Sequence, residues 1–103
     1  MSWATAGLLE SPTAGTILAD SGAQLASTTS FTILIVTQYA ARVAFAWRNS
    51  TNTSDKASQL IKPVSDSPTL MIGLGGLTLL VNERVVLRAE SDMIGEVQAS
   101  LIW

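Results

Sequence analysis

The side chains in this sequence that could do acid–base chemistry are carboxylates. Paired Asp and Glu residues can act as general acid and base, or can hydrogen-bond to a sugar. The candidates here lie in or beside predicted turns rich in Ser and Asn, where solvated acids are expected. They are Asp66, Glu83, Glu90, Asp92 and Glu96. We therefore predict that the chain is not an enzyme, and we assign no catalytic residue.

Cofactor and metal chemistry also lacks its usual residues. The chain contains no Cys and no His, so zinc, copper or haem cannot be held by thiolate or imidazole, and triad-type nucleophilic catalysis is excluded. Calcium could be held by loop oxygens around Asp92 and Glu96, but the usual Asp-x-Asp-x-Asp-Gly spacing is absent. The Gly-rich loop at 73–76 fits neither a dinucleotide fingerprint nor a P-loop, and predicts a turn or bulge. We predict no cofactor, no metal and no small-molecule substrate.

The elements that carry these side chains are predicted to be short strands. The last quarter of the chain, residues 77–103, shows the clearest period-two alternation of apolar and polar residues, over 84–90 and 96–103. This period is typical of strands with one face on a core. Ser, Asp and Gly in residues 90–95 supply turn chemistry between them. The segment predicts a three-stranded antiparallel meander.

The remaining strands complete an all-β fold. Residues 31–38 are apolar on both faces and predict a central strand, whereas 42–48 alternate, with Val43, Phe45 and Trp47 pointing inward. About eight short strands at roughly ten-residue spacing, without a convincing helix, are typical of a sandwich or barrel. We predict an antiparallel β-sandwich, jelly-roll-like, with an N-terminal extended arm.

The domain organisation follows from the 103-residue length, which suits a single domain. Residues 1–15 are predicted to be the arm and residues 16–103 the β-sandwich. The arm carries apolar side chains spaced by Gly, Ser and Pro, so it must fold back on the domain or dock on a neighbour. The sequence predicts neither a signal peptide nor a transmembrane segment, because the long uncharged run at 21–41 is rich in Ser, Thr and Gln.

Charge is unevenly distributed along the chain. The net charge of −2 is too small to direct it to nucleic acid or to an anionic membrane. Residues 1–41 contain only two charged residues, Glu10 and Asp20, and no Lys or Arg. Interface cores are depleted of charge, so this part of the chain suggests an assembled protein; the alternative is a solvated Ser/Thr-rich face. The predicted interface residues are Trp3, Leu8, Leu9, Phe31, Leu34 and Val36.

A family resemblance supports the assembly interpretation. Residues 81–88, VNERVVLR, followed by 95–101, GEVQASL, resemble the C-terminal end of small structural proteins of tailed bacteriophages. The resemblance covers about the last quarter of the chain and brings no catalytic motif. It implies a β-sandwich virion component, a capsid decoration (cement) protein. Such a protein would be made in the host cytoplasm, would sit on the capsid surface as a homotrimer and would clamp neighbouring major capsid proteins.

A second class of function stays open at this point. A glycan- or receptor-binding β-sandwich module, such as a phage tail or fibre component or a lectin-like domain, would present exposed aromatic residues on polar loops. The polar loop at 49–56 contains no aromatic residue. The expected function is therefore a non-enzymatic virion structural protein, whose partners are itself and the major capsid protein.

Overall fold

The computed structural model describes residues 2–39, 42–61, 69–73 and 76–103, and these ranges form eleven strands and no helix. The strands are β1 (Trp3–Thr5), β2 (Leu9–Glu10), β3 (Ile17–Asp20), β4 (Ser27–Thr29), β5 (Thr32–Thr37), β6 (Val43–Arg48), β7 (Asp55–Ile61), β8 (Thr69–Gly73), β9 (Leu77–Leu79), β10 (Arg84–Ala89) and β11 (Glu96–Ile102). In the described part of the chain no helix is available that could span a bilayer.

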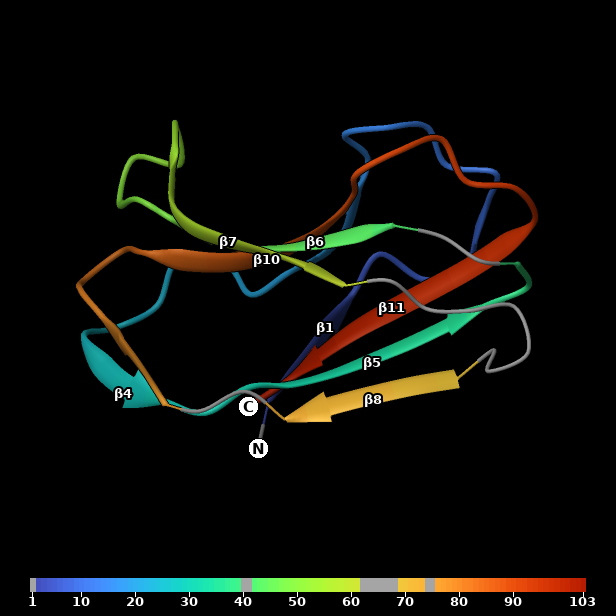
Figure 1. Ribbon diagram of the computed structural model, residues 1–103. Helices are drawn as coiled ribbons and strands as arrows, with labels where there is room; N and C mark the ends of the chain where they lie inside the picture. The colour runs from blue at the N-terminus through green and yellow to red at the C-terminus, as the bar shows by residue number, and fades with distance from the viewer. Residues whose placement is uncertain (1, 40–41, 62–68, 74–75) are drawn as a thin grey trace.

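Two antiparallel sheets pack face to face (Figure 1). Sheet A has the order β1-β11-β5-β8, with β2 also paired to β11, and sheet B has the order β3-β10-β6-β7. β4 and β9 form a separate two-stranded ribbon. The prediction of an all-β antiparallel sandwich is confirmed, with more and shorter strands than expected. Its jelly-roll-like character stays a prediction.

The core lies between the inward faces of the two sheets. Alternate residues of each strand point to opposite faces, so each sheet contributes every second side chain. Sheet A contributes Ile33, Ile35, Val97, Ala99 and Leu101, and sheet B contributes Val43, Phe45, Val85, Leu87 and Ala89, all of them buried. The residues of 43–47 and 97–101 that were predicted to point inward therefore do point into the core.

The outward face of β6 is buried as well. Ala44 and Ala46, which the alternation placed outward, are 4% and 0% exposed. They lie opposite Arg88 and Val86 of β10, and the long stem of an arginine covers neighbouring apolar surface while its head stays in water. Small side chains in the middle of sheet B therefore leave room for long charged ones around them.

The predicted three-stranded meander is wrong in its pairing. The strands form close to the expected positions, but β9 pairs with β4, β10 lies between β3 and β6, and β11 lies between β1 and β5. Residues 90–95 cross from one sheet to the other. Met93 in this crossover is buried at 4% exposure, and its N–H donates to the carbonyl of Pro12. An apolar anchor therefore replaces the expected hairpin turn.

The N-terminal arm is part of sheet A. β1 pairs with β11 so that Trp3 lies opposite Ile102, and β2 pairs with the other end of β11, with Leu9 opposite Val97. Ser2 and Trp103 exchange backbone hydrogen bonds, which brings the two ends of the chain together. Of the two possibilities for the arm, it folds back on the domain. The predicted boundary at residues 15–16 therefore does not separate an arm from the sandwich.

Deleting residues 2–9 should destabilise the fold, because it removes β1 and leaves the edge of β11 without its partner strand. The substitution Trp3→Ala is the matched control, because this side chain is 67% exposed and exposed substitutions change stability by about 0.5 kcal/mol or less. Thermal unfolding followed by circular dichroism should show a clearly lower midpoint for the deletion alone. A truncated chain as stable as the parent would contradict the placement of the arm in the sheet.

Candidate interaction surface

The outer face of sheet A carries no charge along β1, β5 and most of β11. Directly paired residues of antiparallel strands share a face, so the register of β1, β11 and β5 defines three rows pointing away from the core. We call these side chains the outer strip: Trp3, Thr5, Thr32, Leu34, Val36, Gln98, Ser100 and Ile102. None of them is charged. Among the described elements, none forms a second layer on this side of sheet A (Figure 1).

Four of the six predicted interface residues gather on or beside this face. Trp3, Leu34 and Val36 belong to the outer strip, and Trp3 and Val36 are 67% and 43% exposed. Leu8 is exposed and lines a hollow of about 290 Å³ together with Val36 and Glu96. Residues from two distant parts of the sequence thus lie on the same outer face of sheet A, with the polar Gln98 and Ser100 of β11 between them.

The other two predicted interface residues face inward. Phe31 is 1% exposed, and its ring centroid lies 5.6 Å from that of Trp103, so the prediction that it contacts a partner is wrong. Phe31 alternates with the same spacing as Ile33 and Ile35, so the strand pattern could have placed it in the core. Leu9 is partly buried and packs against the core. Ile102 was not among the predicted interface residues, although the alternation within 96–103 placed its side chain on the outward face.

One end of the sheet A face is acidic. Glu10 of β2 and Glu96 of β11 lie directly opposite each other in the register, and both are exposed. Like charges at directly opposed positions destabilise a strand pair. The outer strip is therefore neutral and bordered by two carboxylates, so a partner that brings a cation to this end would relieve their repulsion.

Glu83 is a buried structural acid and not the solvated turn acid that the sequence predicted. Its side chain is 4% exposed. It accepts hydrogen bonds from Lys56 Nζ at 2.6 Å, from the Leu80 backbone N–H at 2.7 Å and from Trp47 Nε1 at 3.1 Å. The bond from Lys56, followed by those from Leu80 and Trp47, lowers the pKa of the Glu83 carboxyl. These contacts tie β6 and β7 to the turn between β9 and β10.

The same contacts occupy Trp47. Its N–H is bonded to Glu83, and Lys56 Nζ lies 4.5 Å from the centroid of its ring. A groove of about 370 Å³ lies beside it, lined by residues that include Phe45, Gln59 and Leu77. Neither the indole N–H nor the ring face under Lys56 is available to a sugar.

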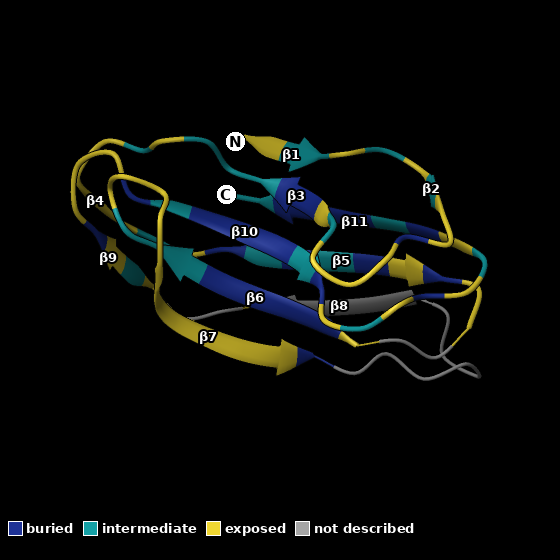
Figure 2. Cartoon of the chain, turned by 90° about the horizontal axis from the view of Figure 1, so that it is seen from above, coloured by how far each residue is buried: buried dark blue, intermediate teal, exposed yellow. Residues whose placement is uncertain are grey.

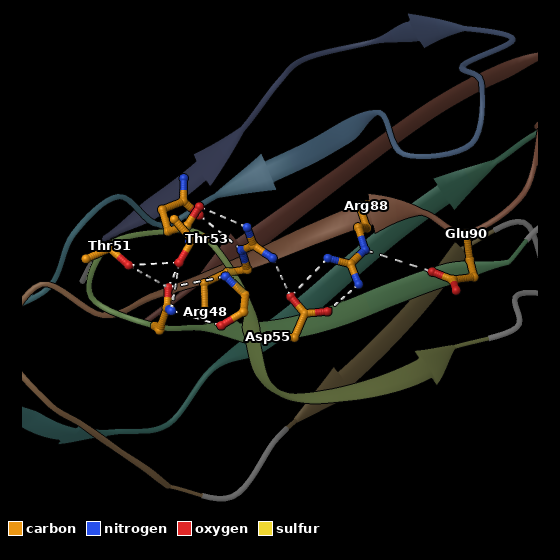
Figure 3. Close-up of polar contacts among 9 residues, drawn as sticks. Arg48, Thr51, Thr53, Asp55, Arg88 and Glu90 are labelled. Atoms are coloured by element: carbon orange, nitrogen blue, oxygen red, sulfur yellow. Dashed lines mark hydrogen bonds and ion pairs between the residues drawn. The ribbon is translucent and has the colours of Figure 1, made fainter.

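The outer face of sheet B carries an ionic ladder (Figure 3). Asp55 at the start of β7 bonds to Arg48 of β6 at 2.7 Å and to Arg88 of β10, and Arg88 in turn lies 3.9 Å from Glu90. The bond from Arg88, with that from Arg48, lowers the pKa of Asp55 from 3.8 to about 2. Arg84 and Asp20 pair at 3.1 Å beside the ladder. The charged and uncharged faces therefore lie on opposite sides of the sandwich.

The other candidate acids have local roles or fall outside the described residues. Asp92 Oδ1 accepts a hydrogen bond from the Ala14 backbone N–H at 2.8 Å, which fixes the end of the segment between β2 and β3. In the ranges that the structure describes, no three acidic side chains gather as a metal site would require. Asp66 and the centre of the Gly-rich loop, residues 74–75, lie outside the described residues.

Comparison of the chain with protein-family models, with curated proteins and with solved structures found no significant match. The proposal for function therefore rests on the two faces of the sandwich.

The acidic pair at the end of the outer strip gives a stability prediction. Glu96→Gln should raise the free energy of unfolding by about 0.2–1 kcal/mol, because it removes a like-charge pair. Glu10→Gln should give a similar gain, and the double substitution should add little to either. Urea unfolding of the four proteins measures this cycle. Additive gains would show that the two carboxylates do not interact.

Acid should weaken the fold through the ionic ladder. The pKa of Asp55 is lower in the folded chain than in the unfolded chain, so the unfolded chain binds a proton more readily and acid favours unfolding. Stability from the ladder is fully present above about pH 5 and is lost between about pH 4 and pH 2. The lowered pKa of Glu83 acts in the same direction.

The variant Asp55→Asn tests the share of the ladder in this pH dependence. It should be less stable than the parent at neutral pH and should lose less stability on acidification, as measured by urea unfolding. Ser50→Ala, an exposed change in the loop between β6 and β7, is the control and should keep the parental slope. An unchanged slope for Asp55→Asn would remove the ladder from the explanation.

Proposed function

We propose that this chain is a non-enzymatic structural protein that assembles with copies of itself through the outer strip. In the form that the phage resemblance implies, it is a capsid decoration subunit, homotrimeric and bound to the major capsid protein on the virion surface. The observation that carries the proposal is the outer strip of sheet A, which bears no charge and which none of the described elements covers. It lies opposite a face on which Arg48, Arg84 and Arg88 are all ion-paired.

The energetic argument concerns desolvation. Covering the outer strip removes apolar surface from water, at about 25 cal/mol per Å², and desolvates no charge. Covering sheet B instead would take the ladder around Asp55 out of water, and buried ion pairs repay that cost poorly. The outer strip is therefore the side on which association costs least.

The size of the strip indicates how it is used. Three strands about 4.8 Å apart and six residues of about 3.3 Å each give a projected area of about 290 Å². A standard interface buries about 800 Å² per partner, so the strip forms the centre of a contact and needs flanking residues. Trp3 and Leu8, both exposed, supply large apolar side chains at its margin, where a second copy and the shell protein can both be reached.

The acidic end of the face suggests how the shell protein is oriented. Glu10 and Glu96 face each other without a cationic partner among the described residues. In the proposed assembly a Lys or Arg of the major capsid protein lies at this end. Charge complementarity of this kind contributes more to orientation and association rate than to affinity.

The alternative function, a glycan- or receptor-binding module, has less support. Such a site would need an aromatic face with free polar groups beside it, and the groove beside Trp47 offers an indole whose N–H is bonded to Glu83. The alternative function requires exposed aromatic residues on the polar loop at 49–56. Tyr39 is 49% exposed, but it lies outside this loop.

The substitution Val36→Glu tests self-association. Light scattering of the purified parent should give a mass several times 10.9 kDa, three times if the trimer is correct, and Val36→Glu should shift it toward one chain because a charge would enter the contact. Thr51→Glu, in an exposed loop on the sheet B side, should keep the parental mass. A parent that stays monomeric at high concentration would overturn the proposal.

Shell binding can be tested with heads of the same phage that lack decoration protein. The parent should sediment with the heads, whereas a Trp3→Ala, Leu8→Ser variant should stay largely in the supernatant. Equal sedimentation of parent and variant would show that this margin does not contact the shell.

A further inference from the structure

β7 is a long strand with an open edge. Its seven residues pair with β6 on one side, and in the described part of the chain no strand pairs with the other side. Residues 55–60 are exposed, and Leu60 is 44% exposed. Figure 2 shows β7 as an exposed strand along the rim of the sandwich, next to the buried β6. About half of its main-chain N–H and C=O groups point away from β6, as in any edge strand.

The usual protection of an edge strand is found only at one end of β7. A register shift lies near its start, opposite Trp47 and Arg48, and bulges and charges are the common means of blocking strand addition. Its two charged residues are both neutralised within the chain: Asp55 by two arginines and Lys56 by Glu83. The centre of the strand, residues 57–60, is Ala-Ser-Gln-Leu and carries no charge.

This strand is complementary to a second copy of itself. A twofold axis through Ser58, perpendicular to the sheet, places Ser58 opposite Ser58, Ala57 opposite Gln59 and Lys56 opposite Leu60. Each pair keeps its side chains on one face, as antiparallel pairing requires, and no like charges are opposed. A register shifted by one residue would place inward residues opposite outward ones.

The groove beneath β7 gives the added strand a place to bury side chains. It has a volume of about 370 Å³ and is lined by Phe45, Trp47 and Leu77 as well as by Ala57 and Gln59 of β7. Ala57 and Gln59 lie opposite Trp47 and Phe45 on the inner side of sheet B, yet both are exposed. A second β7 would extend this inner face beyond its present edge.

We propose that two copies of the chain join through antiparallel pairing of their β7 strands, centred on Ser58, so that the two B sheets become continuous. The contact edge is about 23 Å long, and its main-chain hydrogen bonds supply affinity, as in other cases of strand addition. It is isologous and uses a different surface from the outer strip.

The absence of cysteine from the chain makes the test direct. Directly opposed residues of an antiparallel pair have Cα atoms about 4.5 or 5.5 Å apart, within the range that a disulfide spans. Under mild oxidation Ser58→Cys should therefore form a covalent dimer at least about tenfold faster than Thr51→Cys, an equally solvent-facing position in the neighbouring loop. Mixed Ala57→Cys and Gln59→Cys chains should cross-link to each other faster than either does to itself.

Several outcomes would overturn the inference. Equal cross-linking rates for Ser58→Cys and Thr51→Cys would show that only random collisions are observed. If the thiol of the Ser58→Cys variant stays reduced in the purified chain but becomes protected on phage heads, the edge would be assigned to a strand of the shell protein. Circular dichroism of each variant checks that it is folded, and the conservative Ser-to-Cys change limits damage to β7.

A failure of β7 pairing can be distinguished from a failure of the proposed function. In a Val36→Glu background the Ser58→Cys cross-link should form as fast as in the parent, because the two surfaces lie on different sheets. Loss of the cross-link in that background would show that β7 pairing depends on the outer strip. The proposal that β7 forms an independent contact would then be overturned.

Discussion

The pairing of β11 on both of its edges is the interaction on which the rest of the structure depends. β5 lies on one side, and β1 and β2 lie on the other. One face of β11 places Val97, Ala99 and Leu101 in the core, and the opposite face supplies the middle row of the outer strip. Because β1 pairs with β11, the exposed Trp3 is positioned by the last strand of the sequence.

The sandwich has two chemically different outer faces, and this difference carries the functional argument. On sheet B, Asp55 and its two arginines form a ladder that suits contact with water. On sheet A the corresponding surface is neutral, with carboxylates only at one end. Among the described elements, each sheet is covered on one side, by the other sheet. The uncharged side is therefore the one from which a partner can exclude water at least cost, which supports the proposed assembly.

Strand positions could be predicted from the sequence, because period two is a local property; the 43–47 and 97–101 alternations gave the core directly. Strand partners could not, because Arg84–Ala89 and Glu96–Ile102 look equally suited to a hairpin. In the structure the segment between them crosses from one sheet to the other and buries Met93. The burial of Glu83 was equally hidden, since its partners Trp47 and Lys56 lie 36 and 27 residues away. For the outer strip, charge depletion of residues 1–41 pointed to β1 and β5, and the alternation along each strand would have placed Phe31 inside and Ile102 outside.

Hydroxyl-radical footprinting of the unmodified chain tests the central claim, that the outer face of sheet A is covered in the assembled state. Oxidation of Trp3, Leu34, Val36 and Ile102 would be measured by mass spectrometry at low and at high protein concentration, with Leu25, 81% exposed and outside the strip, as the internal reference. The account predicts that the four strip residues become protected at high concentration while Leu25 does not. Undiminished oxidation of the strip in a sample that has assembled would contradict it.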